Sequence, residues 1–373
     1  MFSIQIKVNY CVVRPIDRQL TEWTALGSLS DVRTLTHLKN EYCLDDSQSS
    51  SLDKKINLSD KESYYGSEYL AAPMHVNIFH QICLIISGQE PSVTPVYIPE
   101  YNLMRIGAHI CPNTYRSLDL LILINSPVKN VQQRNRLRTT WANESNWIRV
   151  RVRQGFLLDS LPLEVDETAI GLTLELSMYR DIIQIDTNGE PVDDTMKLIY
   201  AFRWSLAFCP QAKWLFFVRD DCTVIPYNFE HFLLSVSEAM RQRLIAGAVW
   251  DDPEKSVVDS LLFPGRNLTT TTATTATAGS EPRYLTFVAT SPMLVSAVLS
   301  PVLYITMRFT EFIDQPELFF AAVMHKLFIS PAHVDRIYAF DRKPKPGRER
   351  HLALAFSNSK LVNISSSSSG ENS

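Results

Sequence analysis

Two adjacent carboxylates follow a long apolar run in the segment WLFFVRDDCTV, residues 214–224. The run has the length of a buried strand, and Asp220 and Asp221 come directly after Arg219 at its end. In open α/β sheets ligands bind beyond the carboxyl ends of the strands, so an acid at that place is held by a rigid support. Carboxylate oxygens suit a hard divalent cation that also binds phosphate. The pair therefore predicts a metal-assisted site for a phosphorylated substrate.

The same two acids also have a simpler interpretation. Asp220 can pair with Arg219 and mark a polar turn, and an Asp-Asp pair after an apolar run is a weak motif by itself. The order of the surrounding segments is needed to decide between a turn and a site.

The surrounding segments alternate as expected of β-α-β units in a mixed or parallel sheet covered by helices. Strands are expected at 118–126, 147–158, 214–218 and 244–250, and helices at 130–145 and 193–210. The helix at 193–210 is the clearest, because Asp193 or Asp194 can cap its start and Pro210 lies just past its end.

One uncharged segment, residues 284–307, is long enough to span a bilayer. Pro292, Pro301 and several Ser and Thr residues interrupt it, so we expect a buried strand followed by a core helix that begins near Pro292.

The composition is that of an ordinary globular protein, with 373 residues, 45% hydrophobic, 20% charged and a net charge of −4. This balance gives no reason to expect a nucleic acid as partner. We expect a weakly patterned, stem-like region at 1–115 with a polar linker at 44–68, and a catalytic domain at 116–350. A low-complexity insert at 268–280 interrupts that domain, and the tail 357–373 is expected to be disordered.

The signals for a cellular compartment disagree. Four N-x-[ST] sequons favour the secretory pathway, at Asn57, Asn143, Asn267 and Asn363. The first twenty residues, however, show no apolar core long enough for a signal anchor. Six scattered cysteines without a C-x-x-C pair do not fix the redox compartment.

Several segments, taken in order, resemble the catalytic domain of family 31 glycosyltransferases, the β-1,3-galactosyltransferase-like enzymes. The segment 120–142 resembles the family's strand, turn and R-x-x-x-R-x-T-W signature, with Arg134 and Arg138 as its arginines. ELSMYRDII (175–183) is similar to an E-x-x-x-Y-x-D-I-I segment, and VRDD is similar to the end of the strand that carries a D-D-D motif. YLTFVATSPMLVS and FIDQPELFFAAVMHKLFISPAHVD match two later family segments in the same order.

The resemblance implies a GT-A-type nucleotide-sugar-binding fold with a mixed central sheet flanked by helices. It implies a type II Golgi membrane protein that transfers a hexose, galactose or an N-acetylhexosamine, from a UDP-sugar to a glycan of a glycoprotein or glycolipid. The transfer inverts the anomeric carbon, forms a β-1,3 linkage and uses Mn²⁺. On this basis Asp221 is expected to bind the metal, and the nucleotide-sugar is expected to meet Arg134, Arg138, Lys197 and Asp220. Cys111 and Cys209 are one pair that a disulfide in the Golgi lumen could join.

Four positions depart from the family pattern. Arg219 stands where D-D-D has its first acid, Gln315 replaces one of two later acids, and Thr290 and Phe320 replace glycines. An amide cannot accept the acceptor's proton, so Asp314 is expected to serve as the catalytic base, with Glu317 as a more distant choice. Phe320 is expected to narrow the acceptor site. The alternative is a non-catalytic relative that binds a glycan or a partner enzyme.

Overall fold

A computed structural model describes residues 43, 76–96, 102–112, 117–159, 167–186, 192–251, 286–339 and 343–357 of the chain. The predicted linker 44–68, the insert 268–280 and residues 358–373 of the predicted tail lie outside these ranges. The predicted domain limits stay predictions.

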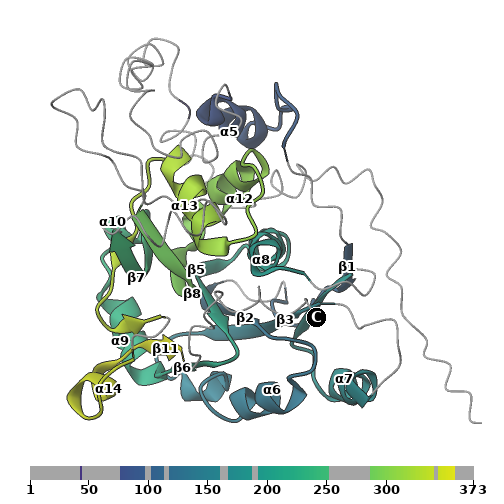
Figure 1. The fold of residues 1–373 in the computed structure, drawn as a ribbon, viewed down its shortest axis with the longest axis vertical. Coiled ribbons are helices and arrows are strands. Elements are labelled where there is room, and N and C mark those ends of the chain that lie inside the picture. Colours follow the sequence, from purple (N-terminus) through teal and green to yellow (C-terminus); the bar gives the residue numbers. More distant parts are fainter. Residues whose placement is uncertain are drawn as a thin grey trace, which may run out of the picture.

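Within the described residues, eight strands form one mixed central sheet (Figure 1). In spatial order they are β1 (Asn102–Arg105), β4 (Ile182–Asp186), β3 (Val152–Leu158), β2 (Leu118–Asn125), β5 (Ala212–Arg219), β8 (Thr286–Ser296), β7 (Ile245–Asp251) and β9 (Ala332–His333). The four strands β4, β3, β2 and β5 run parallel, and β8 is antiparallel to both β5 and β7. The structure confirms the expected α/β class and is consistent with a GT-A-type fold.

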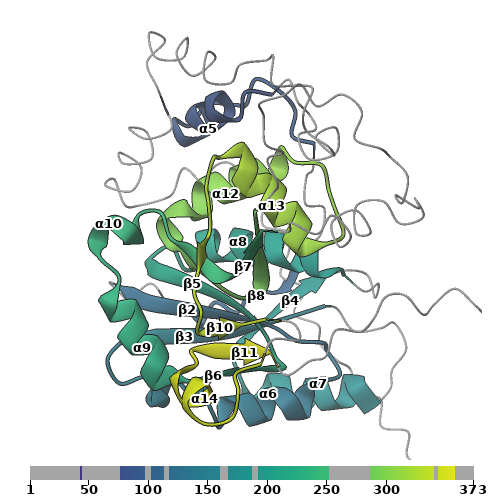
Figure 2. The same ribbon diagram turned by 60° about the vertical axis from the view of Figure 1, so that its left-hand side comes forward.

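Helices cover both faces of this sheet, as Figure 2 shows. One face carries α5 (Ile78–Ile86), α8 (Asp194–Phe208), α12 (Ser300–Arg308) and α13 (Pro316–Lys326). The other face carries α6 (Val131–Arg138), α7 (Glu167–Met178) and α9 (Pro226–Ser235). The short elements are η2 (Glu144–Asn146), α10 (Glu238–Arg241), η3 (Ala297–Leu299) and α14 (Arg348–Leu352).

The two-sided cover explains why the strands β2 and β5 read as unbroken apolar runs. In β5, Leu215 and Phe217 pack in the core under α8 and α12, whereas Trp214, Phe216 and Val218 pack in the core over α6 and α9. A strand buried on both faces cannot alternate apolar and polar residues. The polar residues therefore collect at its ends, where Arg219 begins the turn.

The parallel strands place their carboxyl ends at one edge of the sheet. Asn125 at the end of β2 pairs with Arg219 at the end of β5, and Asp159 directly follows β3. After the turn at 220–221 the chain enters β6 (Cys222–Val224), which joins β11 (Ala355–Ser357) and β10 (Ile337–Tyr338) in a small second sheet.

Three predicted element boundaries are wrong. The helix expected at 130–145 ends at Arg138, where the hydroxyls of Thr139 and Thr140 bind the backbone oxygen of Arg136 and the chain turns. The alternating segment 147–158 becomes a strand only at Val152, because the Glu230 carboxylate accepts the backbone N–H groups of Arg149 and Val150 in place of a neighbouring strand. The helix expected near Pro292 begins instead at Ser300. Pro292 lies within β8, where the register with β7 shifts and a missing N–H is tolerated.

Two disulfides join distant parts of the chain. Cys111 pairs with Cys209 at the end of α8, and Cys43 pairs with Cys83 of α5. The first was one pairing that the sequence left open. None of the helices in the described ranges has the length and hydrophobicity needed to cross a membrane.

Candidate active site

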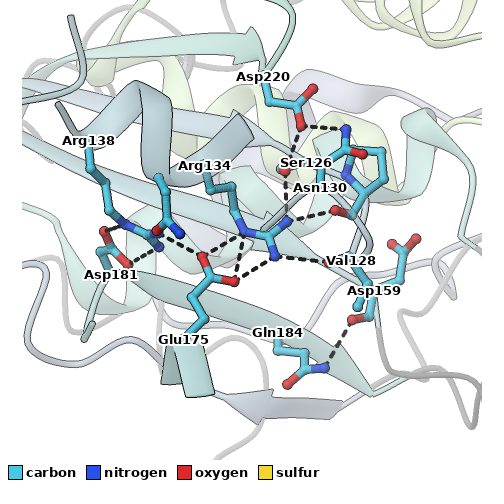
Figure 3. Close-up of polar contacts among 12 residues, drawn as sticks. Ser126, Val128, Asn130, Arg134, Arg138, Asp159, Glu175, Asp181, Gln184 and Asp220 are labelled. Atoms are coloured by element: carbon cyan, nitrogen blue, oxygen red, sulfur yellow. Dashed lines mark hydrogen bonds and ion pairs between the residues drawn. The ribbon is translucent and has the colours of Figure 1, made fainter. Parts of the chain in front are cut away.

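The turn after β5 separates the two acids of the opening motif. Asp220 turns inward and is 6% exposed. Its Oδ2 accepts hydrogen bonds from Ser126 Oγ at 2.7 Å and Asn130 Nδ2 at 2.9 Å (Figure 3). Its backbone oxygen accepts one from Gln133. Asp220 therefore ties the turn to β2 and α6. Its predicted contact with a nucleotide-sugar stays a prediction.

Asp221 faces the other way and is 26% exposed. Its Oδ1 lies 3.6 Å from Arg219 Nε and 3.7 Å from the thiol of Cys222. Burial, and then the charge of Asp221, raise the pKa of Cys222 to about 12, so this thiol stays protonated at neutral pH. The charged groups that this turn offers to solvent are thus Arg219 and Asp221.

The two arginines of the R-x-x-x-R signature lie in the interior (Figure 3). Arg134 has no exposed surface; it binds the Glu175 carboxylate at 2.7 Å and also donates to Ser126 Oγ and to two backbone oxygens. Arg138 binds Glu175 at 2.7 Å and Asp181 at 2.8 Å and lies over the ring of Tyr179. Burial lowers the pKa of Arg138, but its bonds to Asp181 and Glu175 outweigh burial and raise it.

This network unites two sequence segments that resembled the family separately. Glu175, Tyr179 and Asp181 come from ELSMYRDII, and each contacts an arginine of the first signature. Sequence reasoning assigned no role to these three residues, although the charges of Glu175 and Asp181, opposite to those of the two arginines, were a usable signal. The predicted contacts of Arg134 and Arg138 with a diphosphate stay predictions, and the geometry favours positioning, because Arg134 reaches Asp220 through Ser126.

The start of α8 forms the second side of the site. Asp193 caps the helix by accepting the backbone N–H of Met196 at 2.7 Å, as expected. Asp194 accepts a hydrogen bond from Asn125 at 2.8 Å, and its other oxygen lies 3.6 Å from Arg219 Nη1. The helix is thereby joined to the ends of both β2 and β5.

Lys197, one turn further along α8, pairs with Asp159 at 3.1 Å and is almost buried. Burial raises the pKa of Asp159, and Lys197 opposes this effect. The predicted contact of Lys197 with the nucleotide-sugar stays a prediction, and the ion pair gives it a structural role at the same edge of the sheet.

The loop before α13 and the strand β8 form the third side. Asp314 is exposed. Burial raises the pKa of Asp193, and the negative charges of Asp194 and Asp314 raise it further, so Asp314 lies near the start of α8. Glu317, in the first turn of α13, accepts a hydrogen bond from the Thr290 hydroxyl at 2.7 Å. The adjacent Ser291 accepts the backbone N–H of Arg219 at 2.8 Å.

The structure therefore brings some predicted site residues together and separates others. Asp221, Asp314 and the start of α8 lie toward the carboxyl edge of the sheet. Arg134 and Arg138 instead have buried side chains, on α6. Phe320 does not narrow a site, because it is buried and packs against Phe202 in the core. Thr290 does face the site, through its bond to Glu317.

The donor set around Asp221 does not fit a tightly held divalent cation. Within the described ranges, no three His, Cys, Asp or Glu side chains come together to hold a metal ion. The guanidinium of Arg219 lies beside Asp221, where it repels a cation and competes for the same oxygen. The Mn²⁺ expected at Asp221 stays a prediction that these residues do not favour.

Comparisons with known proteins agree with the segments found in the sequence. The family model described as "Galactosyltransferase" matches residues 132–335, more than half of the chain. The chain is 28% identical over 172 residues to UDP-GalNAc:beta-1,3-N-acetylgalactosaminyltransferase 1 of Mus musculus, covering 46% of this chain and 50% of that protein. It is 32% identical over 135 residues to the human Lactosylceramide 1,3-N-acetyl-beta-D-glucosaminyltransferase, covering 35% of each.

The chain spans about half the length of the first of these relatives and a third of the second. The match of the family model includes all of α6 but its first residue, the turn at 220–221, the start of α8 and Glu317. The chain therefore belongs to the galactosyltransferase family.

Proposed function

We propose that this chain is a glycosyltransferase that moves a hexose from a UDP-sugar to a glycan acceptor, with inversion and a β-1,3 linkage. The observation that carries the proposal is the convergence of charged groups from β5, α8 and α13 at the carboxyl edge of the sheet, in a member of this family. The relatives' names, which specify N-acetylgalactosaminyl and N-acetylglucosaminyl transfer, support an N-acetylhexosamine as the sugar, and the family's description supports galactose.

The reaction is a single displacement. The acceptor's hydroxyl oxygen forms a bond to the anomeric carbon while the bond from that carbon to UDP breaks. UDP leaves with the electron pair, and the hydroxyl proton passes to a base. The protein must therefore supply a carboxylate beside the acceptor and positive charge beside the diphosphate.

Two carboxylates can serve as the base. Asp314 is exposed and close to the start of α8, as the sequence suggested. Glu317 is better positioned, because the Thr290 hydroxyl fixes one of its oxygens and Ser291 links the same strand to Arg219. We favour Glu317 as the base, with Asp314 as the second choice.

A hydrolysis and transfer assay separates the two carboxylates. Removing a general base lowers the rate about 10²- to 10⁴-fold, so Glu317→Gln is expected to lose this much in kcat while Asp314→Asn loses far less. Thr290→Val is expected to give an intermediate loss, because it frees the carboxylate without removing it. The reverse order of losses assigns the role to Asp314, and full activity in both variants rejects both.

The second candidate is a non-catalytic relative that binds a glycan or a partner enzyme, and the guanidinium of Arg219 beside Asp221 favours it. Titration of the full chain with UDP discriminates the two, because a glycosyltransferase must bind the nucleotide.

A location in the Golgi lumen, with protein glycosylation as the process, is also a proposal. The disulfides Cys43–Cys83 and Cys111–Cys209 support an oxidising compartment. Detection of both disulfides in protein isolated from cells checks it.

A further inference from the structure

The three arginines near the turn after β5 differ in how tightly carboxylates bind their guanidinium groups. Arg134 and Arg138 are buried, and each binds the Glu175 carboxylate at 2.7 Å. Arg219 is 51% exposed, and its two ion contacts, to Asp194 and Asp221, are both 3.6 Å long. A separation of 3.6 Å is longer than a hydrogen bond, so neither carboxylate holds this guanidinium tightly.

The backbone that carries Arg219 is nevertheless rigid. It is the last residue of β5, it pairs with Asn125, and its N–H donates to Ser291 Oγ at 2.8 Å. The four residues before it in β5 are all buried. A partly exposed cation on a fixed strand end can meet an anionic ligand without a large loss of backbone entropy.

The carboxylates near Arg219 cannot bind an anionic ligand, so its negative charge must be met by Arg219. Asp193 caps α8, Asp159 is paired with Lys197, and Asp220 is bound inside the turn. Asp194 and Asp221, which flank Arg219, repel a diphosphate unless a cation stands between them. Guanidinium is suited to this place because its planar donors match phosphate oxygens in pairs.

We propose that Arg219 binds the diphosphate of the UDP-sugar and stabilises the departing UDP, taking the part that a divalent cation was expected to play. This inference rests on the proposed glycosyltransferase function. As UDP leaves with the electron pair of the broken bond, the N–H groups of Arg219 donate hydrogen bonds to the diphosphate oxygens. Arg219 stays between the diphosphate and the carboxylates of Asp194 and Asp221, and no covalent bond to the protein forms.

Isothermal titration of the full chain with UDP tests this, once in EDTA and once in Mn²⁺. The wild type is expected to bind UDP with the same Kd, within about threefold, in both buffers. Hydrogen bonds to charged groups contribute about 1.5–3 kcal/mol, so Arg219→Gln is expected to weaken UDP binding about 10- to 100-fold in EDTA. Its affinity for uridine, which lacks the diphosphate, is expected to be unchanged.

Two further variants sharpen the result. Arg219→Asp creates three consecutive carboxylates, and its UDP binding is expected to become dependent on Mn²⁺. Arg151→Gln is the matched control, because Arg151 is also half exposed and loosely paired with an acid, Asp119, but lies at the opposite end of the parallel strands. It is expected to bind UDP like the wild type, and melting temperatures check that each variant is folded.

The possible failures are distinguishable. If the wild type binds UDP only with Mn²⁺ and Arg219→Gln binds it equally well, the inference about Arg219 is overturned and the proposed function stands. If the wild type binds UDP in neither buffer, both are overturned and the non-catalytic alternative remains.

Discussion

The buried pair of Arg134 and Glu175 gives the sharpest test of how the site is supported. Replacing Arg134 by Met removes the guanidinium but keeps most of the side-chain volume. The Glu175 carboxylate, which has no exposed surface, then loses its bidentate partner and keeps only Arg138. The Val128 backbone oxygen loses its hydrogen bond, and Ser126 no longer connects the network to the turn at Asp220.

The magnitude follows from the burial of both partners. Removing one member of a buried ion pair costs about 3–5 kcal/mol, because the remaining charge is left without compensation. For a domain of about 150–250 residues, 1 kcal/mol shifts Tm by roughly 2–4 °C, so a fall of about 6–20 °C is expected. The exposed pair of Arg151 and Asp119 is the control, since such pairs contribute about 0–1 kcal/mol.

Thermal unfolding followed by circular dichroism measures both variants. Arg134→Met is expected to melt far below Arg151→Met, and the double change Arg134→Met with Glu175→Leu is expected to recover part of the loss, because no charge is then left buried. Equal Tm values for Arg134→Met and Arg151→Met would refute the reasoning.

Three other predictions concern stability. Burial lowers the pKa of Lys326 from 10.5 to about 8, so between these values the unfolded chain binds more protons than the folded one. The stability of the wild type should therefore rise with pH in this window relative to Lys326→Met, measured by urea unfolding at pH 7.5 and 9.5. Reduction of Cys111–Cys209, which closes a loop of 98 residues, should lower the free energy of unfolding by about 4–5 kcal/mol. A reductant should therefore lower the Tm of the wild type more than that of a Cys111→Ala, Cys209→Ala variant, which lacks this bond. Ser126→Ala, which removes a hydrogen bond to buried Asp220, should cost about 1–3 kcal/mol in the same urea assay.

The central elements were predictable from the sequence because their patterns have one physical cause. The apolar run before Arg219 is buried on both faces, as a parallel central strand requires. The cap at Asp193 needs only the local backbone of the helix start, so its side chain and position predict it. Such features depend on neighbours in the sequence or on burial alone.

Other features depend on partners far along the chain. The strand β3 starts five residues after its apolar alternation begins, because Glu230 of a later helix binds the backbone of Arg149 and Val150. The roles of Arg134 and Glu175 were hidden for the same reason, since they are 41 residues apart and meet only in the fold. From the sequence, Arg134 was expected to contact the nucleotide-sugar. In the structure all of its N–H groups donate hydrogen bonds within the protein.

The residues that depart from the family pattern could be interpreted only with the structure. Sequence alone made Thr290 and Phe320 equal obstacles to the site. In the structure Thr290 positions the Glu317 carboxylate, and Phe320 belongs to the core. From the sequence, Arg219 was expected to impair a metal site. In the structure its guanidinium is exposed and its backbone is fixed, which suits it to bind an anionic ligand.

Amide hydrogen exchange of the full chain with and without UDP tests most directly whether the carboxyl edge of the sheet is the donor site. UDP is expected to slow exchange in the turn at 219–222 and in the first turn of α8, and to leave residues 149–152, at the opposite edge of the sheet where β3 begins, unchanged. Protection that is absent from the turn and the start of α8, or that appears only elsewhere, would contradict the account.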